Sequence, residues 1–257
     1  MLQFYKMVKV TAAIITLNEE KNLERCLKAL KQCVDEIVVL DSFSTDKTAE
    51  ICAAYKVTFI QKDWLGYAQS KNELNKSINS SYILSIDADE VPDQELIDDL
   101  NRIKAEGLDG IYQVNRKTNY CGKWIYHCGW YPEFKLRLFP KKGVKWEGDF
   151  VHETLSFPKS LAVNKLNGHL EHFSYHNESE HRIKAFQYAD LSVQKYLKEK
   201  KKTYFLQPVL SALAKFLSIY VFKRGFLDGR SGWVIAKISA SANHYKYRKL
   251  KDLNKRH

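Results

Sequence analysis

Two aspartates follow a short apolar run in the N-terminal half of the chain. Residues 82–86 are Tyr-Ile-Leu-Ser-Ile, and Asp87, Ala88 and Asp89 come directly after them. A short apolar run that is ended by charge and then by proline is typical of a buried strand. Carboxylates two residues apart at the end of a strand are hard oxygen ligands, which suit Mg²⁺ or Mn²⁺ carrying a substrate diphosphate. Taken alone, the motif has a solvated acidic loop as its alternative explanation.

The elements that must position these aspartates alternate between apolar runs and helical patterns. Strands are predicted over residues 8–17, 36–40, 57–60 and 82–86, with helices at 19–32, 44–55 and 66–78. This alternation implies βαβ units and a mostly parallel sheet, so the predicted fold class is α/β. The carboxyl ends of such strands meet at one edge of the sheet, where open α/β sheets bind their ligands.

Polar residues also follow the first two predicted strands. Thr16, Asn18 and Glu19 end the first strand, and Asp41 and Ser44 follow the second. Asp41 could accept hydrogen bonds from the ring N–H of a base, and Asn18 and Glu19 could reach a base or a ribose. The first motif is also an ordinary helix start favoured by the dipole, and Ser44 an ordinary helix N-cap. Neither GxGxxG nor a P-loop motif is present, so dinucleotide and P-loop chemistry lack support.

The middle of the chain changes character. Short β-like runs at 110–114, 134–139 and 150–155 are followed by predicted helices at 180–202 and 234–247, with a glycine-rich link at 225–233. The chain has 257 residues and 45% hydrophobic residues, enough for one large domain with an appendage. Its five cysteines form no CxxC pair and fit a reducing cytosol, and we expect no signal peptide.

Charge is concentrated at the C-terminal end. Residues 195–257 hold 16 basic and 3 acidic residues, whereas the first 194 residues hold 25 and 27. A basic segment of this kind usually meets nucleic acid or an anionic membrane surface. The apolar stretch 204–222 is interrupted by Gln207, Pro208 and Lys215, which favours docking at a membrane interface over spanning. A helical pair packed on the rest of the chain, with a solvated lysine face, is the alternative.

Together these motifs resemble the family 2 glycosyltransferases, which have the GT-A fold. The resemblance runs from about residue 8 to residue 155 and consists of four motifs in the family's order. These are Thr16-x-Asn18-Glu19, residues 38–48, Gln69-x-Lys71-Asn72 and Asp87-Ala88-Asp89-Glu90. Lys71 stands where arginine is common. Within the family the chain is most similar to the bacterial lipopolysaccharide core glucosyltransferase branch, through Arg137-Leu138-Phe139, His152-Glu153 and the stretch 225–229.

The resemblance implies an inverting transfer of a hexose, glucose in that branch, from a UDP-sugar to a lipid-linked glycan such as lipopolysaccharide core. The residues implied in nucleotide-sugar binding are Thr16, Asn18, Glu19, Asp41, Ser44, Lys71, Asp87, Ala88 and Asp89. Asp89, with Asp87 and His152, would hold Mg²⁺ or Mn²⁺. Two alternatives stay open: a glycosyltransferase for another polysaccharide or glycoconjugate, and a nucleic-acid-binding protein that uses the basic C-terminal segment.

An inverting transfer needs a general base near the acceptor hydroxyl. The candidates that follow the aspartate motif are Glu133, Glu147, Asp149 and Glu153. We favour Glu153 because it matches the family's His-Glu pair and follows an apolar pair of residues. A structural carboxylate that pairs with Arg137 is the alternative role for Glu153.

The expected organisation is therefore a GT-A catalytic domain followed by an extension. The catalytic domain would cover residues 1–178, with a nucleotide-sugar half at about 1–92 and an acceptor half at about 93–178. The basic, helical, membrane-associating extension would cover residues 179–257. We expect a cytoplasmic enzyme that is peripheral on the inner face of the cytoplasmic membrane, with no nucleic acid as partner.

Overall fold

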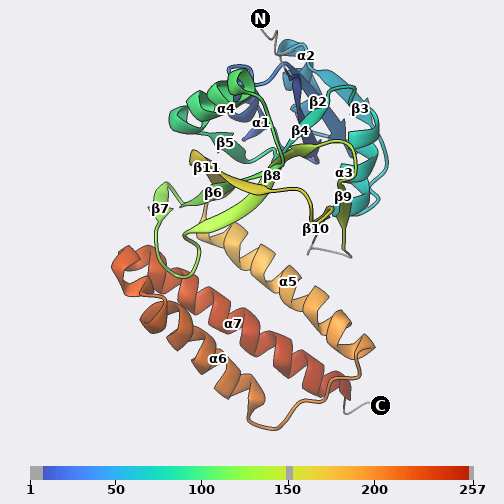
Figure 1. Ribbon diagram of the computed structural model, residues 1–257. Helices are drawn as coiled ribbons and strands as arrows, with labels where there is room; N and C mark the ends of the chain where they lie inside the picture. The colour runs from blue at the N-terminus through green and yellow to red at the C-terminus, as the bar shows by residue number, and fades with distance from the viewer. Residues whose placement is uncertain (1–7, 149–152, 255–257) are drawn as a thin grey trace, which may run out of the picture. The chain divides into compact units, whose positions relative to one another are not determined.

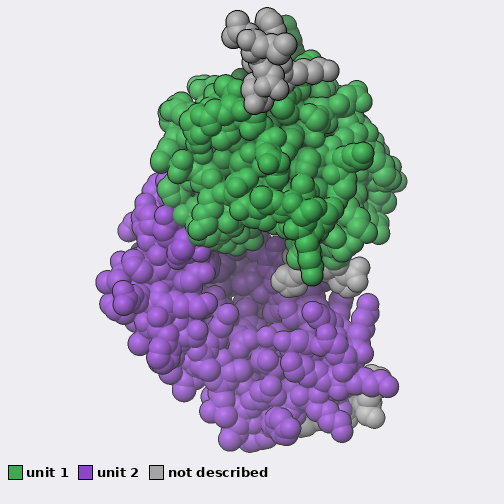
Figure 2. Space-filling view, in the orientation of Figure 1, with its two compact units in different colours: residues 1–116, 133–172 green, residues 117–132, 173–257 purple. Residues whose placement is uncertain are grey.

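The computed structural model describes residues 8–148 and 153–254 (Figure 1). The chain forms two compact units, coloured separately in Figure 2. Unit 1 comprises residues 1–116 and 133–172, and unit 2 comprises residues 117–132 and 173–257. The sequence-based expectation divides the chain once, after residue 178, whereas in the structure residues 117–132 also belong with the C-terminal helices.

The main sheet begins with four parallel strands. They are, in spatial order, β3 (Thr58–Gln61), β2 (Glu36–Asp41), β1 (Val10–Thr16) and β4 (Tyr82–Asp87). The sheet continues through β8 (Glu133–Pro140), β6 (Ile111–Tyr120), β11 (Val163–Tyr175) and β5 (Glu90–Pro92). Here the pairs β4–β8, β6–β8 and β5–β11 are antiparallel. The predicted α/β class, with a parallel sheet in the N-terminal half, is confirmed.

Three shorter strands complete the β-structure. β7 (Lys123–Ile125) pairs with β6, and β9 (Lys145–Glu147) forms a separate antiparallel pair with β10 (Thr154–Ser156). β9 packs against α3, so this two-stranded sheet lies beside that helix.

Helices cover both faces of the parallel strands (Figure 1). α1 (Leu23–Leu30) and α4 (Gln94–Glu106) lie on one side and α3 (Tyr67–Lys76) on the other. α2 (Thr48–Ala54) begins later than predicted, and Ser44 is not its N-cap. The hydroxyl of Ser44 instead donates to the Asp41 carboxylate and accepts the Asn18 N–H, and the N-cap position of α2 is Lys47.

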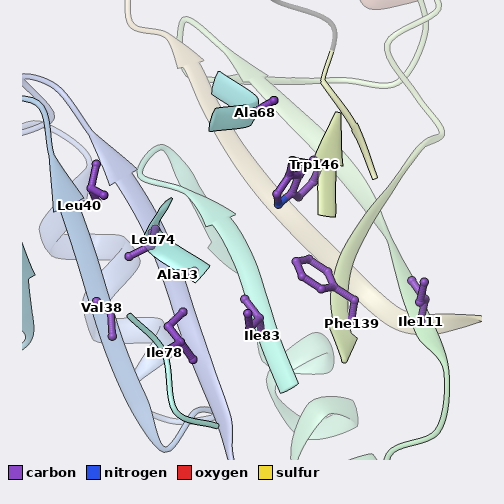
Figure 3. Close-up of a cluster of buried hydrophobic side chains, with 10 residues drawn as sticks. All are labelled: Ala13, Val38, Leu40, Ala68, Leu74, Ile78, Ile83, Ile111, Phe139 and Trp146. Atoms are coloured by element: carbon purple, nitrogen blue, oxygen red, sulfur yellow. The ribbon is translucent and has the colours of Figure 1, made fainter. Parts of the chain in front are cut away.

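Apolar packing fixes α3 on the sheet. β1 and β2 are largely apolar, and because successive side chains of a strand point to opposite faces, Ala13 and Ile15 of β1 and Val38 and Leu40 of β2 share the face that packs on α3. Figure 3 shows the resulting cluster, which consists of Ala13, Val38, Leu40, Ala68, Leu74, Ile78, Ile83, Ile111, Phe139 and Trp146. The rings of Phe139 and Trp146 meet edge to face, with centroids 5.9 Å apart. Each large buried side chain contributes about 1.5–3 kcal/mol, so α3 is firmly placed.

The strand register decides which polar residues meet. β1 pairs with β2 and β4 so that Thr16 lies opposite Asp41 and Ile15 lies opposite Asp87. Asp41 and Asp87 therefore flank the end of β1 at the same edge of the sheet. This is the carboxyl edge at which the sequence predicts a ligand site.

Unit 2 is built around its last helix. α5 (Glu178–Lys198) and α6 (Gln207–Leu217) both pack on α7 (Gly229–Asn254). The π-helical turn η1 (Ser218–Phe222) continues α6, and the short 3₁₀ helix η2 (Gly225–Asp228) leads into α7. In the part of the chain that the structure describes, every helix is too short or too polar to span a lipid bilayer.

The predicted helices at 180–202 and 234–247 are confirmed, but the predicted glycine-rich link at 225–233 is not a link. α7 already begins at Gly229. Gly232 lies within this helix, where an added Cβ would stand 1.8 Å from the carbonyl oxygen of Gly225. Glycine at this position is thus a packing requirement rather than a helix break.

A buried histidine lies in the aromatic core of unit 2. His181 is 3% exposed, and its Nδ1 shares a hydrogen bond of 3.1 Å with the Tyr120 hydroxyl. The rings of Tyr120, Trp130 and Tyr175 surround it. Burial lowers the pKa of His181 from 6.5 to about 4, because the imidazolium form loses its hydration.

This burial predicts that unit 2 loses stability as the pH falls from 6.5 to 4. In that range the unfolded chain binds a proton on His181 and the folded chain does not, so acid favours unfolding. The full contribution is about 3 kcal/mol, reached as the pH approaches 4. Urea unfolding at a series of pH values should give a shallower pH slope for His181→Gln than for the wild type. The exposed-histidine variant His176→Gln should keep the wild-type slope, and equal slopes in all three proteins would contradict the prediction.

Candidate active site

Asp41 organises the loop that follows β2. Its side chain is fully buried, and Oδ1 accepts hydrogen bonds from the hydroxyls of Thr16 (3.0 Å) and Ser44. Oδ2 accepts from the Ser44 N–H at 2.8 Å and from the Gln61 amide at 3.3 Å. Direct contact with a base would require the carboxylate to exchange one of these partners, so that role of Asp41 stays a prediction.

The loops after β1 and β2 are hydrogen-bonded to each other. Asn18, at φ 56°, donates its N–H to the Ser44 hydroxyl and accepts the Thr45 N–H on its side-chain oxygen, both at 2.8 Å. The N–H of Glu19 donates to the Thr48 hydroxyl at 3.0 Å. The predicted base-and-ribose residues thus come together, and they form one braced surface instead of two independent loops.

Asp87 sits between two cations. Its Oδ1 is 3.0 Å from Lys71 Nζ, and its Oδ2 is 2.8 Å from a guanidinium nitrogen of Arg137. Burial by itself would raise the pKa of Asp87, but the charges of Arg137 and Lys71 outweigh it and hold that pKa well below the usual range. Asp87 is therefore ionised at any physiological pH.

A fully buried glutamate lies beneath Asp87. Glu90 has no exposed surface and accepts from Arg137, from Arg116 (3.1 Å) and from the N–H of Asp87 (3.2 Å). Arg116 also contacts Glu133 at 2.7 Å. Burial by itself would lower the pKa of Arg137, but the charges of Asp87 and Glu90 outweigh it and raise that pKa above its usual value. The sequence analysis missed this role of Glu90 and Arg116, although Arg137, an arginine inside the strand-like run 134–139, was a usable signal.

Lys71 connects Asp87 to the predicted general base. It projects from α3, its side chain is 3% exposed, and its Nζ is 3.2 Å from Glu153 Oε1 as well as 3.0 Å from Asp87. Its ammonium group also lies 4.8 Å from the centre of the Trp146 ring, a cation–π distance. In the described part of the chain Glu153 thus pairs with Lys71, in place of the alternative partner Arg137.

The other base candidates are placed differently. Glu133 contacts Arg116 and Lys135; burial would raise its pKa, but these two cations lower it. The hydrogen bond and charge of Lys145 lower the pKa of Glu147, which lies exposed on β9. A lowered pKa makes a carboxylate a weaker base. Asp149 and the predicted metal ligand His152 lie outside the described residues.

A histidine outside the predicted set of site residues lies against Asp89. His172 Nε2 is 3.2 Å from Asp89 Oδ2, and both side chains are less than one-fifth exposed. The antiparallel pairing of β11 with β5 causes this, because it places His172 opposite Glu90. Carboxylate oxygen suits Mg²⁺ and Mn²⁺, and imidazole is a common metal ligand, so the donor set fits a divalent ion. The described residues contain no preformed group of three such ligands.

Comparison with known sequences gives a consistent result. The model of glycosyl transferase family 2 matches residues 11–160. An uncharacterized glycosyltransferase of Rickettsia typhi is 28% identical over 96% of this chain and 88% of its own length. A lipopolysaccharide core biosynthesis glycosyltransferase, LpsC of Rhizobium meliloti, is 29% identical over 90% of each chain.

Solved structures give more distant matches. Residues 1–349 of Staphylococcus aureus TarS are 12% identical, with a TM-score of 0.43 over 96% of this chain and 91% of TarS. Glucosyl-3-phosphoglycerate synthase from Mycobacterium tuberculosis, in complex with Mn²⁺, UDP and glucosyl-3-phosphoglycerate, is 21% identical, with a TM-score of 0.36 over 45% of each chain. Both TM-scores lie below 0.5, so family membership rests on the sequence match.

The buried charge network predicts a large stability loss on removal of Glu90. Glu90→Ala leaves Arg137 and Arg116 without their shared buried carboxylate, and breaking such a network costs about 3–5 kcal/mol. Glu50→Ala, which removes an exposed carboxylate near the start of α2, should cost under about 1 kcal/mol. Urea unfolding at neutral pH measures both, and equal losses would show that the network contributes little.

Proposed function

This chain belongs to glycosyltransferase family 2, and we propose that it transfers a hexose from a UDP-sugar to a hydroxyl of a lipid-linked glycan. We further propose that the configuration at the anomeric carbon is inverted and that the sugar is glucose. The observation that carries the proposal is the line of contacts from Asp87 through Lys71 to Glu153. In support of the proposal, Lys71 contacts both the ionised Asp87 carboxylate and the carboxylate of Glu153, the residue we favour as the general base.

The donor would bind across the carboxyl ends of β1, β2 and β4. Asn18, Glu19 and Ser44 lie on the braced loops and would contact the uridine, with Thr16 and Asp41 holding those loops in place. Asp87 and Ala88 follow β4, and the ionised Asp87 is suited to accept hydrogen bonds from ribose hydroxyls or from metal-bound water. Arg137 and Lys71 prevent this carboxylate from rotating away.

Asp89, with His172 beside it, would hold Mg²⁺ or Mn²⁺, and the nearby Asp87 would support it. When bound, the ion would neutralise charge that develops on the leaving diphosphate. Lys71 adds a fixed positive charge on the same side of the sheet, where its three donors are shared between two carboxylates and a ring face.

Glu153 would take the proton of the acceptor hydroxyl. As that oxygen bonds to the anomeric carbon, the bond from this carbon to the diphosphate oxygen breaks and UDP leaves. Lys71 orients the Glu153 carboxylate, and a base needs such orientation because proton transfer requires hydrogen-bond distance. Glu133 and Glu147 are weaker candidates because the cations beside them lower the pKa of each carboxylate, whereas Glu153 shares its lysine with Asp87.

The acceptor is proposed from the sequence relatives. LpsC, whose name assigns it to lipopolysaccharide core biosynthesis, matches this chain over 90% of both lengths. We therefore propose a lipid-linked core oligosaccharide, met on the inner face of the cytoplasmic membrane. Another polysaccharide or glycoconjugate is the alternative acceptor within the same reaction class.

The donor proposal predicts that one UDP-sugar binds in the presence of Mn²⁺ and that Asp89→Asn weakens this binding. Loss of a metal-site group typically costs about 10–100-fold. Calorimetric titration of UDP-sugars into the wild type, Asp89→Asn and the exposed-carboxylate control Asp98→Asn would measure it. Titration of Mn²⁺ alone tests the metal role separately. If no UDP-sugar binds to the wild type, the transferase proposal is wrong; if Asp89→Asn binds as tightly, the role of Asp89 is wrong.

The base assignment predicts that Glu153→Gln slows transfer without loss of donor binding. General-base catalysis contributes about 10²–10⁴-fold, so kcat should fall by at least about 100-fold. The Kd for the UDP-sugar should stay close to the wild-type value, because Glu153 would act on the acceptor. Glu147→Gln removes the exposed candidate and should leave kcat near wild type. A larger loss in Glu147→Gln than in Glu153→Gln would reassign the base.

A further inference from the structure

One face of the helix formed by α6 and η1 carries an exposed apolar stripe. Its members recur at helical spacing and lie within one side of the helix. Each is between 39% and 58% exposed, and they are Leu206, Val209, Leu210, Leu213, Leu217 and Val221. Single exposed apolar residues are ordinary, but six that share one face form a contiguous patch, which marks an interaction surface.

The opposite face of the same helix is already occupied. α6 lies beside α7 in unit 2, and Pro208 and Ile219 are buried there. The Asn243 side chain of α7 donates to the Ser211 carbonyl at 2.9 Å, which fixes the rotation of α6. The apolar stripe is therefore held outward by the packing of unit 2.

Aromatic side chains mark both ends of the stripe. Tyr204, Phe205 and Phe222 are 80%, 78% and 80% exposed, more than any other large apolar residue in the described part of the chain. Aromatic rings at the ends of an apolar surface are typical of the boundary between lipid headgroups and acyl chains.

The charge within the segment that carries the stripe is of one sign. Residues 200–224 contain six basic residues and no acidic residue. Lys200, Lys201 and Lys202 precede the helix, and Lys223 with Arg224 follows it, all exposed. Lys215 is also exposed, but by helical spacing it lies on the side of α6 opposite the stripe. A second copy of this chain seated on the same face would bring two identical sets of cations together, so the charge disfavours self-association and favours an anionic partner.

We propose that this face of α6 and η1 docks on an anionic lipid surface. The apolar stripe enters the boundary of the acyl chains, and the flanking lysines and arginine meet lipid phosphates. The sequence analysis predicted membrane contact for the whole C-terminal segment; the structure assigns it to this one face. Vesicles contain neither a sugar nucleotide nor a glycan, so the test is independent of the proposed transfer reaction.

The decisive experiment compares two exposed apolar residues of unit 2. Leu210 and Ile183 are 58% and 59% exposed, but only Leu210 lies in the stripe. In flotation with vesicles of equal parts phosphatidylglycerol and phosphatidylcholine, Leu210→Glu should bind about tenfold more weakly or worse, because an inserted apolar side chain is lost. Ile183→Glu should bind as the wild type does. Circular dichroism shows whether each variant keeps its helices.

A second comparison tests the charges. The triple change Lys200→Gln, Lys201→Gln and Lys202→Gln should weaken binding to the anionic vesicles, and added salt should weaken the wild type similarly. The proposal is overturned if the wild type floats equally with pure phosphatidylcholine, does not float at all, or is unaffected by Leu210→Glu. It is also overturned if the wild type is a dimer that Leu210→Glu dissociates, or if it binds RNA in preference to vesicles through the same residues.

Discussion

A glutamate without exposed surface is the constraint on which the candidate active site depends. Removing a carboxylate from water is costly unless cations and N–H groups replace the lost hydration, and Glu90 has both. Arg137, Arg116 and the Asp87 N–H contact it, and Arg137 also reaches the Asp87 side chain. The orientation of Asp87 at the end of β4 therefore follows from the need to satisfy a charge buried beneath it. The free energy that this network requires is supplied by the apolar core around it.

Strand pairing then decides which groups share the carboxyl edge of the sheet. The parallel register sets Asp41 and Asp87 on either side of β1, and the antiparallel pairing of β5 with β11 brings His172 to Asp89. Rigid strands and the packed helix α3 hold these groups in place. A fixed arrangement suits an active site, because small displacements of reacting groups lower the rate steeply. The loops after β1 and β2 are irregular, and side-chain hydrogen bonds brace them.

Unit 2 also has a hydrogen-bonded polar group in its core, but it leaves one apolar surface exposed. Its core buries His181 among aromatic rings and packs Gly232 of α7 against the Gly225 carbonyl. One face of α6, however, exposes apolar side chains to water, and basic residues precede and follow the helix. A folded chain exposes such a surface at a cost, so a partner that covers it is the economical explanation. The proposed lipid-linked acceptor would be carried by such a lipid surface, so the proposed docking would confine the catalytic unit to the place where its substrate lies.

Local patterns in the sequence by themselves determined the alternation of strands and helices, the Asp87–Asp89 motif at the end of β4, and the basic C-terminal segment. These are properties of neighbouring residues, and the family motifs added the assignment of the chain. The tertiary structure alone decided the partners: Lys71 with Glu153, Arg137 with Asp87, and His172 with Asp89. Glu153 and Lys71 are 82 residues apart, and Arg137 and Asp87 are 50 apart. Contacts over such separations depend on strand order and helix packing, which periodicity and composition do not encode.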